Sequence, residues 1–227
     1  RTVSSAASDV YKRQALDQSV SVDRDLSPLR KNYYSWREPY ATPGSVKMEQ
    51  IVLQLNEVLA EDAIVANGAG NYAAWLHRYF QYKSFKTQLA PTSGSMGYGI
   101  PAAISAKLER PNTEVVCLAG DGCAQMSIQE FGTAVQYKAN IIIIISNNGV
   151  YGTIKMHQER TYPGRTSGTN MLNPDFASLA RSYGGFGETV EKTAEFLPAF
   201  ERARSAGKPA IIELKTNPLA LSPQTPA

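Results

Sequence analysis

Two polar clusters that follow apolar runs constrain this chain more than any other feature. Val115–Ala119 is short, apolar and partly β-branched, and the Gly-Asp-Gly turn of residues 120–122 follows it directly. The isoleucine run Ile141–Ile145 leads in the same way into Asn147 and Asn148. Runs of this kind are typical of strands that are buried on both faces of a parallel sheet. Each polar cluster is therefore predicted to begin where a core strand ends.

The segment between the two runs predicts a helix. Its apolar residues keep a roughly helical period, at Met126, Ile128, Phe131, Ala134, Val135 and Tyr137. Strand, turn, helix and strand form one βαβ unit, so both clusters lie at the carboxyl ends of parallel strands. Open α/β sheets bind ligands at that edge. We therefore expect the two clusters to face one crevice.

The residue types in these clusters indicate an anion held together with a metal ion. Gly120 and Gly122 allow the backbone to approach a ligand closely, and N–H groups at the start of a helix favour a phosphate. Asp121 supplies a carboxylate oxygen and Asn148 an amide oxygen. A magnesium ion bound to a diphosphate requires oxygen ligands of this kind in octahedral array.

The spacing of the clusters resembles a known signature. Residues 123–146 separate Gly-Asp-Gly from Asn-Asn, and this pattern is similar to the thiamine diphosphate-binding motif of the acetolactate synthase, pyruvate decarboxylase and benzoylformate decarboxylase superfamily. Either cluster alone would more often indicate a hairpin turn or a loop. Both together, on either side of a βαβ unit, favour the cofactor site.

This resemblance implies a role for each residue of the two clusters. Asp121, the Asn148 side chain and the Val150 main-chain carbonyl would bind the metal ion, while Gly122, Cys123 and Gly149 would lie against the diphosphate. The cofactor-binding residues implied in this part of the chain are Gly120, Asp121, Gly122, Cys123, Asn148, Gly149, Val150 and Tyr151.

A second glycine-rich turn follows the predicted strand Ala63–Ala66. Gly68, Gly70 and Ala73 match a variant of the dinucleotide-binding fingerprint, which raises an NADP-linked oxidoreductase as an alternative. Such a site usually needs an acidic residue about twenty positions further on, and no Asp or Glu occurs between Asp62 and Glu109. In the resembled family the same turn contacts the diphosphate, and the residues at those positions are Gly70, Asn71 and Tyr72.

Small residues dominate the segment from Pro91 to Ala103, so its backbone can run close to a ligand. The segment resembles a Gly-x-Met-Gly-x-Gly-x-Pro-Ala-Ala motif of the same superfamily. The resemblance implies that the Gly94 carbonyl accepts a hydrogen bond from the cofactor's 4′-amino group and that Met96 wedges between the two cofactor rings. Taken alone, Met96 would more often be core filler.

The loop after Asn148 is similar to that of benzoylformate decarboxylase. In acetolactate synthase a tryptophan a few positions further on shapes the substrate site, and no tryptophan follows Trp75 here. The substrate therefore stays open between decarboxylation and carboligation of 2-oxoacids.

Composition excludes several other classes of function. The chain of 227 residues is 43% hydrophobic and has a formal charge of +3, without a dense basic cluster or an apolar run long enough to span a membrane. We therefore expect neither nucleic acid nor membrane as a partner. The only cysteines, Cys117 and Cys123, do not indicate a disulfide framework, and the start of the chain lacks the features of a secretion signal, so a cytoplasmic location is expected.

The chain divides into four predicted parts. Residues 1–14 look like a non-native or disordered segment. Residues 15–44 are rich in proline and are expected to lack regular structure, as a linker from a missing middle domain. Residues 45–216 form the cofactor-binding domain, and residues 217–227 form a C-terminal tail.

The remaining patterns predict an α/β fold, a three-layer α/β/α sandwich around a mostly parallel sheet of about five or six strands. Ser45 is placed to cap the first helix of the domain. Further helices are expected at 46–61, 174–183 and 194–206, and further strands at 87–90, 187–190 and 210–214.

The resemblance also bears on activity. In that superfamily a separate pyrimidine-binding domain supplies the glutamate that activates the cofactor, and active sites lie between subunits. It therefore implies a thiamine diphosphate- and magnesium-dependent carboligase or decarboxylase that acts on 2-oxoacids, is homo-oligomeric when complete, and is inactive as this chain alone. A non-catalytic assembly module is a further alternative, which the intact metal-binding pattern argues against.

Overall fold

The computed structural model describes residues 25–223 and divides the chain into two units, residues 1–38 and 39–227. The described part of the first unit contains the helix α2 (Ser27–Trp36). The expectation that residues 15–44 lack regular structure is therefore wrong for this stretch. Pro28 lies in the first turn, where backbone N–H groups have no partner within the helix, so proline is tolerated there. The segment 1–14 falls outside the described residues.

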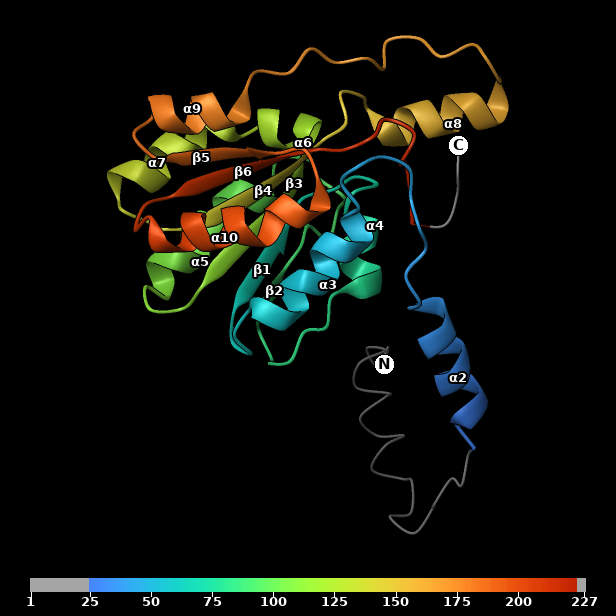
Figure 1. The fold of residues 1–227 in the computed structure, drawn as a ribbon, viewed down its shortest axis with the longest axis horizontal. Coiled ribbons are helices and arrows are strands. Elements are labelled where there is room, and N and C mark those ends of the chain that lie inside the picture. Colours follow the sequence, from blue (N-terminus) through green and yellow to red (C-terminus); the bar gives the residue numbers. More distant parts are fainter. Residues whose placement is uncertain (1–24, 224–227) are drawn as a thin grey trace, which may run out of the picture. The chain divides into compact units, whose positions relative to one another are not determined.

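A six-stranded parallel sheet forms the centre of the second unit (Figure 1). Its strands lie in the order β2-β1-β3-β4-β6-β5, and every neighbouring pair is parallel. They are β1 (Ile64–Asn67), β2 (Gln88–Leu89), β3 (Val115–Gly120), β4 (Ile142–Asn147), β5 (Phe186–Val190) and β6 (Ala210–Lys215). The predicted parallel α/β fold is confirmed, and the two apolar runs that precede the polar clusters become the adjacent inner strands β3 and β4.

Helices cover both faces of this sheet. One face packs against α3 (Met48–Val58), α4 (Ala73–Tyr79) and α10 (Phe196–Ser205). The other packs against α5 (Gly99–Glu109), α7 (Phe131–Gln136) and α9 (Phe176–Ser182). The short α6 (Asp121–Gln125), α8 (Gly152–Thr161) and the 3₁₀ turns η1 (Ile128–Glu130) and η2 (Thr193–Glu195) complete the described elements.

Successive side chains of the inner strands pack into two different hydrophobic clusters, one on each face of the sheet. In β4, Ile142 and Ile144 belong to the cluster under α3, α4 and α10, whereas Ile143 and Ile145 belong to the cluster on the opposite face. Successive side chains of a strand point to opposite faces, so a strand covered on both faces must be apolar throughout. The uninterrupted isoleucine run is the result.

The single helix predicted from Met126 to Tyr137 is wrong. The chain forms α6, η1 and α7 instead, with a break at Ser127. There the backbone leaves the helical region (φ −145°, ψ 17°), and the side-chain hydroxyl donates to the Gly97 carbonyl at 2.8 Å. A tertiary hydrogen bond thus overrides the helical period of the sequence.

The predicted cap of α3 is also wrong. Lys47, not Ser45, occupies the N-cap position, and the Lys47 side chain forms no capping hydrogen bond with the helix. Thr193 performs a related role from a distant part of the chain, because its hydroxyl accepts a hydrogen bond from the Lys47 N–H at 2.8 Å. The Ser45 carbonyl accepts from the Thr193 N–H instead.

Candidate cofactor site

The candidate site lies where three neighbouring strands end. Residues 68–72 follow β1, the Gly-Asp-Gly turn runs from the end of β3 into α6, and residues 148–151 connect β4 to α8. Since β1, β3 and β4 are adjacent and parallel, their carboxyl ends bring the three turns together. The predicted convergence of the two polar clusters on one crevice is therefore present, and the turn after β1 joins them.

A cavity that opens to solvent lies between these turns. All of the predicted cofactor-binding residues except Gly94 and Gly149 line this cavity: Gly70, Asn71, Tyr72, Met96, Gly120, Asp121, Gly122, Cys123, Asn148, Val150 and Tyr151. The turn proposed for a dinucleotide opens into the same cavity as Asp121, so the two turns form one site.

Asp121 is a buried carboxylate in the lining of this cavity, with an exposed fraction of 4%. Its Oδ1 accepts from the Gly122 N–H, and its Oδ2 accepts from the Gly149 N–H, both at 2.8 Å. Asn173 also donates to Oδ2, at 2.7 Å. Burial raises the pKa of Asp121, and these hydrogen bonds offset only part of that effect.

Neutral donors are thus the partners of the Asp121 carboxylate. Among the ion pairs formed by residues 25–223, none involves Asp121. A buried charge is costly unless it is paired or coordinates a metal. Asp121 therefore fits a site that a cation completes.

Asn148 and Val150 line the same cavity as Asp121. The Asn148 Oδ1 accepts from the Val150 N–H at 3.1 Å, which folds the side chain back over the turn after β4. An aspartate, an asparagine side chain and a main-chain carbonyl are oxygen donors of the type that Mg²⁺ prefers. No cluster of three or more His, Cys, Asp and Glu side chains suited to a metal occurs among residues 25–223.

The glycines of the β3–α6 turn leave room for two tyrosine rings that any larger residue would overlap. A Cβ atom on Gly120 would lie 2.7 Å from the Tyr72 ring, and one on Gly122 would lie 2.8 Å from the Tyr151 ring. Both rings line the cavity. The turn therefore approaches the Tyr72 and Tyr151 rings so closely that only glycine fits at these two positions.

Cys123 connects the turns that surround the cavity. Its Sγ accepts from the Tyr72 hydroxyl at 3.3 Å and from the Gly97 N–H at 3.1 Å. Burial is the main cause of the raised pKa of Tyr72, and the neighbouring Cys123 adds to it. Gly68 approaches so closely that a Cβ atom there would lie 2.3 Å from the Cys123 sulfur. Cys117 and Cys123 are both buried, and both are free thiols.

The structure separates the two residues predicted from the small-residue segment. Met96 lines the cavity and is 37% exposed, so it is not core filler. Gly94 lies outside the cavity lining, with a φ of +69° and open space around the position of a Cβ atom. The role implied for the Gly94 carbonyl stays a prediction.

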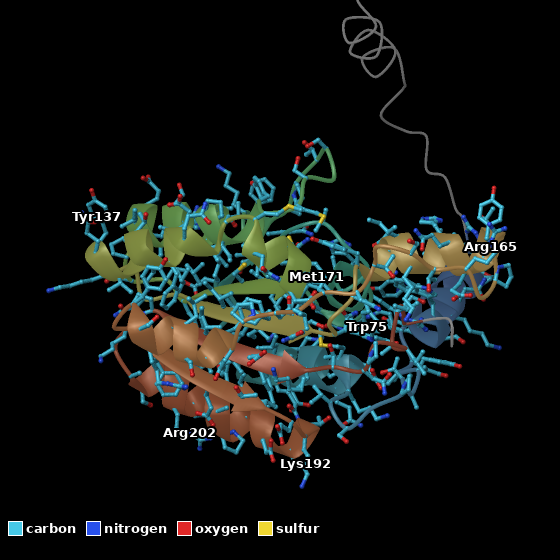
Figure 2. All side chains as sticks on the ribbon, turned by 90° about the horizontal axis from the view of Figure 1, so that it is seen from above. Trp75, Tyr137, Arg165, Met171, Lys192 and Arg202 are labelled. Carbon is cyan, nitrogen blue, oxygen red and sulfur yellow. The ribbon has the colours of Figure 1, made fainter. Side chains whose placement is uncertain are left out.

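Several residues at the cavity are not predicted from the sequence. Ser146, Thr153 and Ile154 line it, and the Thr153 hydroxyl donates to Asn71 Oδ1 at 2.8 Å, which ties the start of α8 to the turn after β1. Met171 donates its N–H to the Gly149 carbonyl at 2.8 Å. In the view of Figure 2, Met171 and Tyr137 are labelled in different parts of the molecule, Tyr137 at its outer end. Thr153 and Ile154 belong to the segment after Asn148 that resembles the benzoylformate decarboxylase loop, whereas no motif marks Ser146 or Met171.

Comparison with known proteins decides which family this site represents. Residues 68–214 match the family described as "Thiamine pyrophosphate enzyme, C-terminal TPP binding domain". The chain belongs to the thiamine pyrophosphate enzyme family. Thiamine pyrophosphate is another name for thiamine diphosphate, so the match confirms the resemblance that the two polar clusters indicate.

Individual relatives in this family are similar over most of the chain. The acetolactate synthase large subunit of Haemophilus influenzae is 36% identical over 196 residues, which is 83% of this chain and 34% of the relative. The acetolactate synthase large subunit of Cyanidium caldarium is 32% identical over 187 residues, 79% of this chain and 32% of the relative. This chain thus spans about a third of the length of the curated relatives that it matches.

A solved structure gives the same fold. The thiamine diphosphate-dependent 4-hydroxybenzoylformate decarboxylase of Rhodococcus jostii RHA1 superposes with a TM-score of 0.73 and 32% sequence identity, over 79% of this chain and 34% of that chain. As a member of the thiamine pyrophosphate enzyme family, the chain carries its C-terminal cofactor-binding domain. None of the helices described between residues 25 and 223 has the length and apolar character of a membrane span.

Proposed function

We propose that this chain is the diphosphate-binding part of a magnesium- and thiamine diphosphate-dependent enzyme that acts on 2-oxoacids as a carboligase or a decarboxylase. The buried Asp121 carboxylate, which no cationic side chain of the described chain pairs with, carries the proposal. Its position at the ends of inner strands, beside a glycine turn and an asparagine, supports a cation bound together with a diphosphate.

In this proposal each group of residues has a distinct task. Asp121, the Asn148 side chain and the Val150 carbonyl hold Mg²⁺. The glycine turns would let the backbone lie close to the diphosphate, and Met96 in the cavity lining would contact the rest of the cofactor. When bound, the cofactor would supply the electron sink that decarboxylation of a 2-oxoacid requires.

The other parts of the reaction are proposed to come from outside this chain. The matched segments make up only about a third of the relatives named above, and the activating glutamate belongs to the pyrimidine-binding domain of the resembled family. We propose that the complete protein is a cytoplasmic homo-oligomer. A 4-hydroxybenzoylformate decarboxylase and acetolactate synthases are similar to the chain to nearly the same extent, so both reaction types remain within the proposal.

The proposal predicts that thiamine diphosphate and Mg²⁺ together stabilise the chain against heat. A ligand at one hundred times its dissociation constant adds about 2.7 kcal/mol. For a chain of this size, each kcal/mol raises the unfolding midpoint by about 2–4 °C. The measurement is thermal unfolding with Mg²⁺ alone, thiamine diphosphate alone, both, or neither, and only the combination should give the full shift.

NADPH in the same assay separates the proposal from the dinucleotide alternative. Stabilisation by NADPH, together with none by Mg²⁺ and thiamine diphosphate, would favour an oxidoreductase that uses the turn of residues 68–73. The absence of any shift would favour the non-catalytic assembly module. The shared cavity argues against the first of these, because residues 70–72 line it together with Asp121.

We also expect the purified chain to leave pyruvate and benzoylformate unchanged in the presence of Mg²⁺ and thiamine diphosphate. The reason is that the activating glutamate is assigned to a domain outside this chain. Carbon dioxide release from either substrate is the measurement, with a complete acetolactate synthase as the positive control. Turnover by the chain alone would show that it contains its own activating group.

A further inference from the structure

Asn173 forms hydrogen bonds with three other side chains, although it belongs to no sequence motif. It lies in the loop before α9, and its amide nitrogen donates to Asp121 Oδ2 and to Asn147 Oδ1, both at 2.7 Å. Its own Oδ1 accepts from Gln125 Nε2 at 2.6 Å. Both N–H groups of the Asn173 amide are thus in use, one of them on the carboxylate of the candidate metal site.

A second carboxylate lies at the far end of this chain of amides. Glu213 in β6 is completely buried, and its Oε1 accepts from Asn147 Nδ2 at 2.6 Å and from Lys215 Nζ at 2.5 Å. Its Oε2 accepts from the Thr189 hydroxyl at 3.2 Å. The hydrogen bonds therefore run from β6 through Asn147 in β4 and on to Asn173 and Asp121.

The carboxylates at the two ends fix the direction of every hydrogen bond between them. A charged carboxylate only accepts, so Asn147 must turn its NH₂ group toward Glu213 and its oxygen toward Asn173. That oxygen requires a donor, so Asn173 must present its NH₂ group to both Asn147 and Asp121. The orientation of the Asn173 amide, which is ambiguous when an asparagine stands alone, follows from its neighbours.

This arrangement holds Asp121 without neutralising it. Lysine or arginine at position 173 could donate to the same oxygen, but its positive charge would compete with a bound cation. The neutral amide of Asn173 instead donates to Oδ2 beside the Gly149 N–H, while the Gly122 N–H donates to Oδ1, so three neutral donors fix the plane of the carboxylate and add no positive charge. Lys215, the cation of the network, lies at the other end beside Glu213.

We propose that Asn173 is a positioning residue for the metal site and that it orients Asp121 toward Mg²⁺. Asn147 orients the Asn173 amide, and Glu213 in turn orients Asn147. The inference rests on the proposed function, because it assigns Asp121 to the metal. Asn173 acts through Asp121 and is not itself a metal ligand in this assignment. Groups that orient metal ligands typically change metal affinity about 10–100-fold when they are removed.

The test compares Asn173→Ala with Asn140→Ala in this chain of 227 residues. Asn140 also donates through its side-chain amide, to the Gly207 carbonyl at 3.0 Å, but it precedes β4 and so lies at the opposite edge of the sheet. Thermal unfolding is followed during a titration of Mg²⁺ at saturating thiamine diphosphate, and then during a titration of thiamine diphosphate at saturating Mg²⁺. Each variant thus gives two half-saturation concentrations and a midpoint without ligand.

For Asn173→Ala we expect the half-saturating Mg²⁺ concentration to rise about tenfold or more. The half-saturating thiamine diphosphate concentration at saturating Mg²⁺ should stay near the wild-type value, because Asn173 does not line the cavity. Asn140→Ala should change neither. Asn173→Ser, which keeps a donor but is too short to reach both oxygens, should give an intermediate Mg²⁺ requirement and serves as the second variant if alanine prevents folding.

An unchanged Mg²⁺ requirement in both Asn173 variants would overturn the inference. So would equal weakening of Mg²⁺ and thiamine diphosphate binding together with a lower midpoint without ligand, because that pattern indicates a structural role only. If the wild-type chain itself shows no shift with Mg²⁺ and thiamine diphosphate, the proposed function fails and the inference fails with it. This outcome is distinguished from the others because it appears before any substitution is made.

Discussion

Asp121→Ala is expected to abolish the stabilisation of the chain by Mg²⁺ and thiamine diphosphate. The substitution removes the charged member of the proposed metal-binding set and leaves the Asn148 oxygen and the Val150 carbonyl, which are neutral. We expect Mg²⁺ binding to weaken by at least about 100-fold, the upper end of the range found when groups that merely orient a metal ligand are lost. The measurement is the ligand-dependent unfolding midpoint, read against the midpoint of the same variant without ligand.

Asp175→Ala is the matched control for this experiment. Asp175 is a carboxylate from the same region, where it caps α9 by accepting hydrogen bonds from the Ser178 N–H and hydroxyl. Hydrogen bonds to Ser178 hold the pKa of Asp175 below its usual value. Losing this cap should cost about 1 kcal/mol of stability and leave the response to Mg²⁺ intact. An Asp121→Ala variant that responds to Mg²⁺ as strongly as this control would contradict the assigned metal site.

Gly187→Ala is expected to destabilise the fold strongly, although it adds only one methyl group. An added Cβ atom would lie 2.0 Å from the Ala177 carbonyl oxygen and 2.8 Å from the Ala177 carbonyl carbon. Both atoms belong to the backbone of α9, so no side-chain rotation relieves the overlap. Moving the helix away from β5 should cost about 3 kcal/mol or more of unfolding free energy, measured by urea denaturation.

Gly184→Ala separates this overlap from simple backbone strain. Gly184 has a φ of +89° and open space around the position of its Cβ atom. Alanine there carries only the cost of a left-handed conformation, about 1–2 kcal/mol. If Gly187→Ala costs no more than Gly184→Ala, α9 does not pack against β5 as closely as described.

The inner strands were predictable because burial on both faces leaves a strong mark on the sequence. Ile141–Ile145 and Val115–Ala119 are apolar throughout, and no surface helix or loop requires that pattern. The sequence also placed Asp121 and Asn148 at the same sheet edge, because topology alone brings the carboxyl ends of adjacent parallel strands together.

Local patterns failed where distant contacts decide the backbone. The helical period around Met126 continues through Ser127, but the hydrogen bond from Ser127 to Gly97 breaks the helix there. At the start of α3, likewise, the Lys47 N–H donates to the Thr193 hydroxyl, which lies well over a hundred positions away, and Ser45 does not cap the helix. Such contacts join residues whose proximity the sequence does not reveal.

Asn173 illustrates the same limit within the candidate site. It lies 52 positions from Asp121, in a loop whose path over the sheet cannot be read from composition. Its place directly before the helix predicted at 174–183 indicates only a helix boundary. The donor that completes the Asp121 carboxylate therefore becomes visible only in three dimensions.

The position of β6 has a consequence for the order in which a growing polypeptide can acquire this site. β6 is the last strand along the described chain, yet it lies between β4 and β5 (Figure 1). During synthesis from the N-terminus, β4 and β5 therefore emerge before the strand that joins them, and each must wait with an unpaired edge. β6 also carries Glu213, which accepts the hydrogen bond from Asn147. Synthesis must therefore reach β6 before this hydrogen bond can form, so the network that ends at Asp121 is completed only after β6 has inserted between β4 and β5.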